Sequence, residues 1–294
     1  MQALYDVPAP AKLNLFLHVV GKRPDGYHLL ESLFTLVDWA DTLHFEKRSD
    51  GLLQRHDQGD ALPTDDLCLR AARLLQQHAA CPLGADIHIE KRLPSGAGMG
   101  GGSSDAASTL LALNRLWGLN LPRKQLLELG LKLGADVPFF VGGNTAFVEG
   151  IGEILTPLAM ASRRFAIIKP PASIPTARIF SSPLLQRSES MVIVEGFAGN
   201  ESQLTQSGFG RNDLQQAAEA ECEEVSKALA ALEARFGNSR MTGSGSAVFA
   251  ELSERIQVGV SNQPEATLED LPPAWVGKIC RSLEVHPLRD WAQD

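Results

Sequence analysis

The chain has 294 residues, which is longer than the usual single domain and predicts two domains. Its hydrophobic content of 44% and charged content of 21% are typical of an ordinary soluble globular protein. The formal net charge of −8 argues against a general nucleic-acid or anionic-membrane binder, because such proteins need a basic face.

The numbers and spacing of cysteine and histidine indicate the redox environment and whether a metal site is expected. The four cysteines form no C-x-x-C pair and are too few for a disulfide scaffold, so we expect a reducing, cytoplasmic environment. The seven histidines show no H-E-x-x-H spacing, and no metal held by protein side chains is expected. The N-terminal stretch has no basic segment before an apolar run, and no run of about 18 apolar residues occurs, so neither a signal peptide nor a membrane span is predicted.

The first half of the chain alternates strands and helices. Residues 11–22 alternate with a period of two and predict a strand, and residues 31–48 predict two further strands after a Pro-Asp-Gly turn. An amphipathic helix is expected at residues 65–79. A strand is expected at residues 85–93, with His88 on its solvent face. Residues 103–117 predict a helix with Ser103 or Ser104 as N-cap.

Further along, residues 121–133 predict a helix that ends at Gly134, followed by a loop, a short turn and a strand over 134–150. A strand and Pro-rich loop at 163–180 open the second half, so we place the domains at residues 1–158 and 159–294. One long helix is expected at 212–237, a loop into a strand at 239–252 and a helix within 257–275. Because the elements mix without a regular β-α-β rhythm, the predicted fold class is α+β.

The stretch "LPSGAGMGGGSSDAAS", residues 93–108, is a glycine-rich loop between a strand and a helix. Glycine lets a ligand approach the backbone closely. The unpaired N–H groups and the dipole of the following helix attract anions. The loop contains a G-x-G-x-x-G match at Gly96, Gly98 and Gly101.

Common nucleotide motifs do not fit this loop. A Rossmann site needs an acidic residue about 20 positions on, where this chain predicts a helix. A Walker A loop needs lysine where Gly102 stands, and the V-A-I-K and H-R-D motifs of protein kinases are absent. The alternative without a ligand is that this stretch is a flexible hinge. What remains is a backbone-amide cradle, with the Ser103 and Ser104 hydroxyls available to a phosphate or to Mg²⁺.

Three motifs in order resemble those of the GHMP kinase family. They are "PSGAGMGGGSSDAAS" with Met99 in the usual leucine place, "PAPAKLNLFLHVVGKRPDGYH" near the N-terminus and "MTGSGSAVFAEL" near the C-terminus. The resemblance implies a two-domain α+β GHMP kinase fold with the active site in the cleft between domains, and ATP with Mg²⁺ as cofactors. It implies these ATP-binding residues: Pro94, Ser95, Gly96, Ala97, Gly98, Met99, Gly100, Gly101, Gly102, Ser103 and Ser104.

Residues 11–28 and 133–158 narrow the resemblance to GHMP kinases of the non-mevalonate isoprenoid pathway. These enzymes phosphorylate the 2-hydroxyl of a small cytidine-diphosphate substrate. No carboxylate ligand for Mg²⁺ is evident, so phosphates, water and the two serines are expected to hold it. As partners, we expect no nucleic acid and no membrane, and a monomer or weak homodimer.

Asp136 and Lys12 are the expected catalytic pair. From the residues alone, Asp136 reads as a helix cap because Pro138 suits a first helical turn, and Lys12 as an edge-strand lysine. The resemblance implies instead that Asp136 is the general base and that Lys12 holds it ionised and stabilises the moving phosphoryl group. Asn14 lies two residues on, on the same strand face, and would contact substrate hydroxyls.

The remaining substrate contacts are expected from two short stretches. The resemblance implies that Tyr27 and Phe180 stack on either side of the cytosine, that His28 reads the base edge and that Thr176 faces the substrate. The residues alone allow a partly buried Tyr27 ring with a wet hydroxyl.

Two departures and two alternatives stay open. Asp66 stands where asparagine is usual, near the expected adenine position, and Asp105 stands where alanine or asparagine is frequent. An ionised aspartate accepts hydrogen bonds but does not donate them, so the adenine contact is open. The alternatives are another GHMP kinase of homoserine or mevalonate type, and a non-catalytic ligand-binding protein of the same fold.

Overall fold

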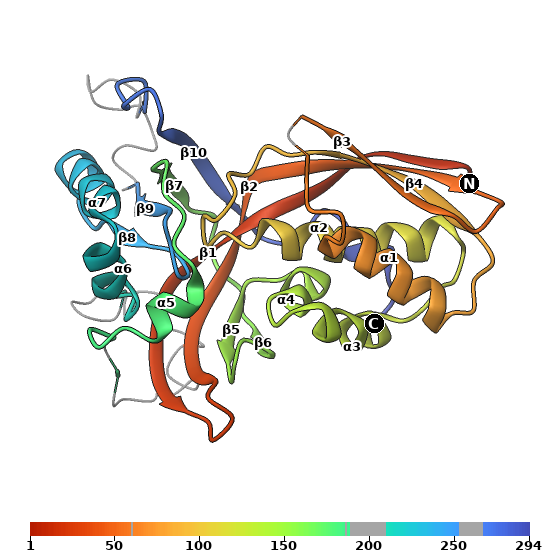
Figure 1. Ribbon diagram of the computed structural model, residues 1–294, viewed down its shortest axis with the longest axis horizontal. Coiled ribbons are helices and arrows are strands. Elements are labelled where there is room, and N and C mark those ends of the chain that lie inside the picture. Colours follow the sequence, from red (N-terminus) through yellow and green to blue (C-terminus); the bar gives the residue numbers. More distant parts are fainter. Residues whose placement is uncertain (60, 186, 189–209, 253–266) are drawn as a thin grey trace.

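The computed structural model describes residues 1–59, 61–185, 187–188, 210–252 and 267–294 (Figure 1). Of the range 257–275, in which a helix was expected, residues 257–266 lie outside these ranges, and residues 267–275 form turns and loop and not a helix. Within them, no helix has both the length and the apolar character that a membrane crossing requires.

A long antiparallel hairpin runs through both halves of the molecule (Figure 1). It consists of β1 (Ala3–Lys22) and β2 (His28–Arg48), with Lys12 opposite Leu36. The prediction of two strands within 31–48 was wrong. β2 is continuous because it pairs along its length with β1 and also with β4 (Gly84–Glu90), β10 (Val276–Leu283) and β5 (Ala146–Glu149).

The described strands form one connected sheet. Its main order is β3-β4-β2-β10-β7-β9-β8, with β1 and β5 paired to β2 and β6 (Ile154–Pro157) paired to β5. The other strands are β3 (Leu53–Gln58), β7 (Arg164–Lys169), β8 (Arg240–Met241) and β9 (Val248–Glu251). Only β3 and β4 pair in parallel among these strands, so the predicted α+β class is confirmed.

Helices of the first half lie together beside the hairpin (Figure 1). They are α1 (Leu67–His78), α2 (Gly101–Leu116), α3 (Arg123–Leu133) and the short α4 (Val137–Gly142). α1 and α3 confirm the predicted helices, and α3 ends at Gly134. α4 replaces the predicted turn, because Pro138 at its start suits a first helical turn.

The predicted serine N-cap of α2 was wrong. Gly100 is the N-cap, in the left-handed conformation with φ of 72° that glycine adopts without strain. Ser104 therefore lies inside the helix, and its hydroxyl donates a hydrogen bond of 2.7 Å to the Pro10 carbonyl of β1. This bond holds the start of α2 against the hairpin.

The second half carries α5 (Thr176–Phe180), α6 (Gln215–Glu221) and α7 (Glu223–Phe236). The single long helix predicted at 212–237 was wrong, because Cys222 is extended and separates α6 from α7. Both helices place apolar residues, such as Ala218 and Val225, in one core with β7 and β9. The break lets two short helices face the same core from different directions.

The hairpin and the C-terminus connect the two halves. Val7 and Ala9 of β1 pack in the core of the first half, whereas Leu17 and Val19 pack in that of the second. The tail after β10 returns to the first half, where Leu288 and Ala292 join its core. The domain boundary at residue 158 therefore stays a prediction. The residues after β10 pack on the first half, although they follow this boundary in the sequence.

Candidate active site

A cleft of about 840 Å³ lies where the hairpin, the glycine-rich loop, the start of α4, α5 and the loop before β9 meet. Ten of the predicted site residues line it. They are Lys12, Asn14, Tyr27, His28, Gly96, Gly98, Gly100, Asp136, Thr176 and Phe180.

Lys12 is a buried lysine at the cleft floor. Its side chain is 4% exposed, and its backbone N–H donates to Met99 O of the glycine-rich loop at 3.0 Å, so β1 is covered here on both edges. The edge-strand reading of this lysine was therefore wrong. Its Nζ lies 3.7 Å from Asp136 Oδ2 and donates to Asn14 Oδ1 at 2.5 Å. Burial lowers the pKa of Lys12, while the nearby Asp136 carboxylate opposes that shift.

Asp136 occupies the N-cap position of α4, but its side chain makes no capping hydrogen bond. Its carboxylate instead faces Lys12 at the cleft, and 32% of the Asp136 side chain is exposed. The capping interpretation of this carboxylate was therefore wrong. A partly exposed carboxylate at the cleft can accept a proton from a bound hydroxyl.

Asn14 is oriented by both halves of the molecule. Its backbone N–H donates to Thr242 Oγ1 at 2.9 Å, and its side-chain Nδ2 donates to Ser32 Oγ at 3.0 Å. These contacts leave Oδ1 facing the Lys12 ammonium. The shared strand face expected for Lys12 and Asn14 is thus confirmed by a direct bond.

Two glycine loops pack against each other at the cleft. They are the glycine-rich loop at residues 93–100 and the loop at residues 242–247. Gly96, Gly98 and Gly100 have φ of 62°, 72° and 72°, so only glycine fits without strain. Ser246 N donates to Gly96 O at 3.2 Å, and Ala247 N to Ala97 O at 3.1 Å. These contacts hold residues 93–100 against the second loop, which favours a defined loop over the flexible hinge.

The rest of the predicted ATP-binding stretch lies outside the cleft lining. These residues are Pro94, Ser95, Ala97, Met99, Gly101, Gly102, Ser103 and Ser104. Ala97 and Met99 are buried in the core below the loop. The Ser104 hydroxyl is buried against Pro10, so the expectation that it is available to a phosphate or Mg²⁺ was wrong.

The aromatic side of the cleft differs from the expected arrangement. The His28 ring stacks on Phe180, with ring centroids 5.0 Å apart and planes 21° from parallel, whereas Tyr27 is 60% exposed. The ring facing Phe180 is thus that of His28 and not that of Tyr27. Burial lowers the pKa of His28, which favours the neutral imidazole. Thr176 Oγ1 lies 2.8 Å from Ser244 Oγ across the cleft mouth.

Sequence reasoning missed further residues of this site, and five of them have an evident part in its construction. Gly243, Ser244 and Gly245 line the cleft, and the C-terminal glycine motif was a signal that could have found them. Ser32 and Thr242 orient Asn14, and no sequence pattern marks them because their role follows from strand pairing.

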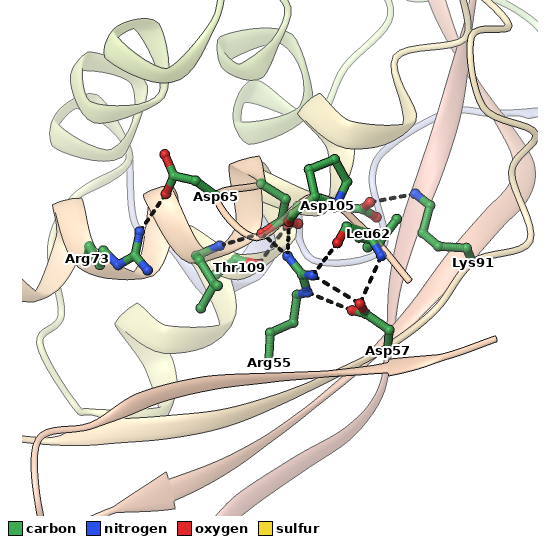
Figure 2. Close-up of polar contacts among 11 residues, drawn as sticks. Arg55, Asp57, Leu62, Asp65, Arg73, Lys91, Asp105 and Thr109 are labelled. Atoms are coloured by element: carbon green, nitrogen blue, oxygen red, sulfur yellow. Dashed lines mark hydrogen bonds and ion pairs between the residues drawn. The ribbon is translucent and has the colours of Figure 1, made fainter. Parts of the chain in front are cut away.

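The two unusual aspartates are both engaged in ion pairs, and Figure 2 shows that of Asp105 with Lys91. Asp66 is the N-cap of α1, accepts from Leu69 N at 3.1 Å and lies 2.8 Å from Arg55 Nη1. Asp105 Oδ2 accepts from Lys91 Nζ at 2.6 Å. Within the described residues, no group of three or more histidine, cysteine or acidic side chains could hold a metal ion.

Comparison with known proteins identifies the family of the chain. The profile for the GHMP kinases N terminal domain matches residues 66–144, and the profile for the GHMP kinases C terminal domain matches residues 197–264. The fold resembles a solved homoserine kinase from Cytophaga hutchinsonii, with a TM-score of 0.68 at 18% identity over 97% of this chain and 96% of that chain. The fold and the cleft therefore define a GHMP kinase, an ATP-dependent kinase of small molecules.

More similar relatives define the family within this class. The chain is 62% identical over 295 residues to a 4-diphosphocytidyl-2-C-methyl-D-erythritol kinase of Methylibium petroleiphilum, covering 99% of both chains. It is 54% identical to that of Variovorax paradoxus, over 99% of this chain and 100% of the relative. A solved 4-(cytidine 5'-diphospho)-2C-methyl-D-erythritol kinase superposes with a TM-score of 0.72 at 37% identity, covering 84% and 89%. The chain belongs to the 4-diphosphocytidyl-2-C-methyl-D-erythritol kinase family of GHMP kinases.

Proposed function

We propose that this kinase transfers the γ-phosphoryl group of ATP to the 2-hydroxyl of 4-diphosphocytidyl-2-C-methyl-D-erythritol. This reaction belongs to the non-mevalonate route to isoprenoid precursors. The observation that carries the proposal is the Lys12–Asp136 pair in one cleft with both glycine loops. A ligand-binding protein without catalysis has no need of a carboxylate held beside a buried ammonium.

The reaction needs little covalent help from the protein. Asp136 accepts the proton of the substrate hydroxyl as its oxygen attacks the γ-phosphorus, and the bond to the β-phosphate oxygen breaks to release ADP. The Lys12 ammonium stabilises the charge on the transferring group. Asn14, fixed by Thr242 and Ser32, orients the hydroxyl.

The glycine-rich loop is the proposed cradle for the ATP phosphates. Gly96, Gly98 and Gly100 present their backbone to the cleft, and the N-terminus of α2 adds its dipole. Mg²⁺ would be held mainly by phosphate oxygens and water, with the Ser103 hydroxyl in the first turn of α2 as a further ligand. When bound, Mg²⁺ neutralises charge on the β- and γ-phosphates.

The other end of the cleft is the proposed cytidine site. The stacked His28 and Phe180 rings form an aromatic surface on which a pyrimidine can lie, with the exposed Tyr27 beside them. A neutral imidazole can both donate to and accept from a base edge. A homoserine or mevalonate substrate would not need this surface, so the aromatic pair favours a cytidine-containing substrate over these alternatives.

A coupled ADP-release assay tests the proposed substrate. The purified protein is given ATP and Mg²⁺ with 4-diphosphocytidyl-2-C-methyl-D-erythritol, mevalonate or homoserine in parallel. We expect turnover on the first compound to exceed that on the others by about 10³-fold in kcat/KM or more. Equal or absent turnover on all three would contradict the proposal. A reaction without acceptor measures background ATP hydrolysis.

A further inference from the structure

A buried acid–lysine–acid bridge lies behind the glycine-rich loop. Lys91, just after β4, donates through Nζ to Asp41 of β2 and, at 2.6 Å, to Asp105 Oδ2 of α2. Figure 2 shows the Asp105–Lys91 pair between α2 and the sheet. Asp41 is fully buried and Asp105 is 3% exposed. None of the three side chains lines the catalytic cleft.

The bridge joins the two ends of the glycine-rich loop. Asp41 Oδ1 accepts from the backbone N–H groups of Arg92 and Leu93, at 2.6 Å and 2.7 Å, where the chain enters the loop. Asp105 lies near the start of α2, where the chain leaves the loop. The Lys91 ammonium lies beside Gly101, since a Cβ on that glycine would be 3.6 Å from Nζ. One cation therefore fixes the distance between the entrance and the exit of the loop.

Asp105 is costly for the fold. Its Oδ1 is buried and has no hydrogen-bond partner among the described residues. A buried carboxylate with an unsatisfied oxygen destabilises a protein compared with a neutral side chain of the same size. Stability alone therefore does not explain a charged group at this position.

We propose that Asp105 is a positioning residue of the ATP site, which acts through Lys91 to hold the glycine-rich loop in its phosphate-binding shape. The inference rests on the proposed assignment of that loop to ATP. It places Asp105 behind the loop and out of contact with ATP. Loss of the bridge then weakens ATP binding, while the acceptor site at the other end of the cleft keeps its geometry.

Two substitutions at Asp105 test the proposal, with Asp65→Ala as control because Asp65 is an exposed carboxylate that pairs with Arg73. Direct titration of ATP without acceptor is measured at one pH, together with KM and kcat for both substrates. Asp105→Ala should raise the Kd and KM for ATP about tenfold, with kcat and acceptor KM changed less than about twofold. Asp105→Asn keeps an oxygen for Lys91 but loses the charge, so it should raise the Kd and KM for ATP by a smaller factor than Asp105→Ala does.

The outcomes distinguish a failure of this positioning role from a failure of the proposed kinase function. Equal effects of Asp105→Ala on ATP and acceptor parameters would overturn the positioning role. If Asp105→Ala does not fold, Asp105→Asn decides alone: a raised Kd for ATP with an unchanged acceptor KM supports the positioning role, and an unchanged Kd for ATP contradicts it. A wild-type protein that binds no ATP would instead contradict the proposed function.

Discussion

At the scale of single residues, the site depends on the ion pair of Lys12 and Asp136, whose side chains differ in solvent exposure. Lys12 is almost fully buried, whereas Asp136 is partly open to the cleft. The buried ammonium cannot move to solvent, so it fixes the electrostatic environment of the carboxylate that we propose as the proton acceptor. Asn14 completes the arrangement, because its Oδ1 accepts a hydrogen bond of 2.5 Å from Lys12 Nζ.

Asp136→Asn is expected to reduce kcat by on the order of 10² or more, because the amide cannot accept the hydroxyl proton. The thermal midpoint should stay close to that of the wild type, since this side chain makes no capping bond to α4. Steady-state kinetics and thermal unfolding measure the two effects. Asp50→Asn is the control, as Asp50 pairs with Arg48 at the surface away from the cleft. A near-normal kcat for Asp136→Asn would show that the carboxylate only orients the hydroxyl.

At the scale of elements, the two glycine loops act as one unit. A Cβ at Gly98 would meet the Thr242 carbonyl and the backbone of Gly245, and a Cβ at Gly243 would meet the Gly98 carbonyl. The loops come from opposite ends of the chain and touch through backbone atoms that only glycine leaves accessible. The phosphate cradle therefore depends on how closely these two elements approach.

Gly98→Ala is expected to raise the KM for ATP about tenfold or more and to lower the free energy of unfolding by roughly 1–3 kcal/mol. The cause is the clash with the Thr242 carbonyl added to the strain of a positive φ. Gly118→Ala is the matched control, since Gly118 has a similar φ of +70° but no atom within 4 Å of the added Cβ. It should lose about 1 kcal/mol and keep its KM for ATP. Equal effects of both variants would show that backbone strain, and not loop contact, decides.

At the scale of the whole molecule, the C-terminus completes the first half. β10 lies between β2 and β7, and the tail then packs against α3 and α4. The buried Arg123 of α3 binds this tail through the carbonyls of Arg289 and Ala292 and also donates to Val141 O of α4 at 2.9 Å. Its Nε pairs with Asp294 at 2.5 Å. A single guanidinium thus joins the last residues to the helix that precedes Asp136.

Arg123→Met is expected to lower the free energy of unfolding by about 3 kcal/mol, because buried carbonyls lose their donor. Hydrogen exchange should increase selectively over residues 285–294, while kcat falls less than for Asp136→Asn. Urea unfolding and exchange measured by mass spectrometry check both effects. Arg73→Met removes an exposed pair with Asp65 and should change stability by less than about 0.5 kcal/mol. Unchanged exchange of the tail would contradict the proposed anchoring role.

The amino-acid sequence by itself determined the class of the fold, most helices of the first half and ten of the residues that line the cleft. Local patterns carry this information, because helix periodicity, glycine density and a motif of fixed spacing are all short-range features. Lys12, Asn14 and Asp136 were predicted as a group, and the structure brings them together.

Only the tertiary structure decided which alternative each residue takes. Long-range pairing made β2 one strand, and a shared core divided the expected long helix into α6 and α7. The bond from Ser104 to Pro10 removed that hydroxyl from the phosphate site, and the position of Phe180 gave its stacking partner as His28. These outcomes depend on contacts between distant segments, whose free energies are set by packing and not by local propensity.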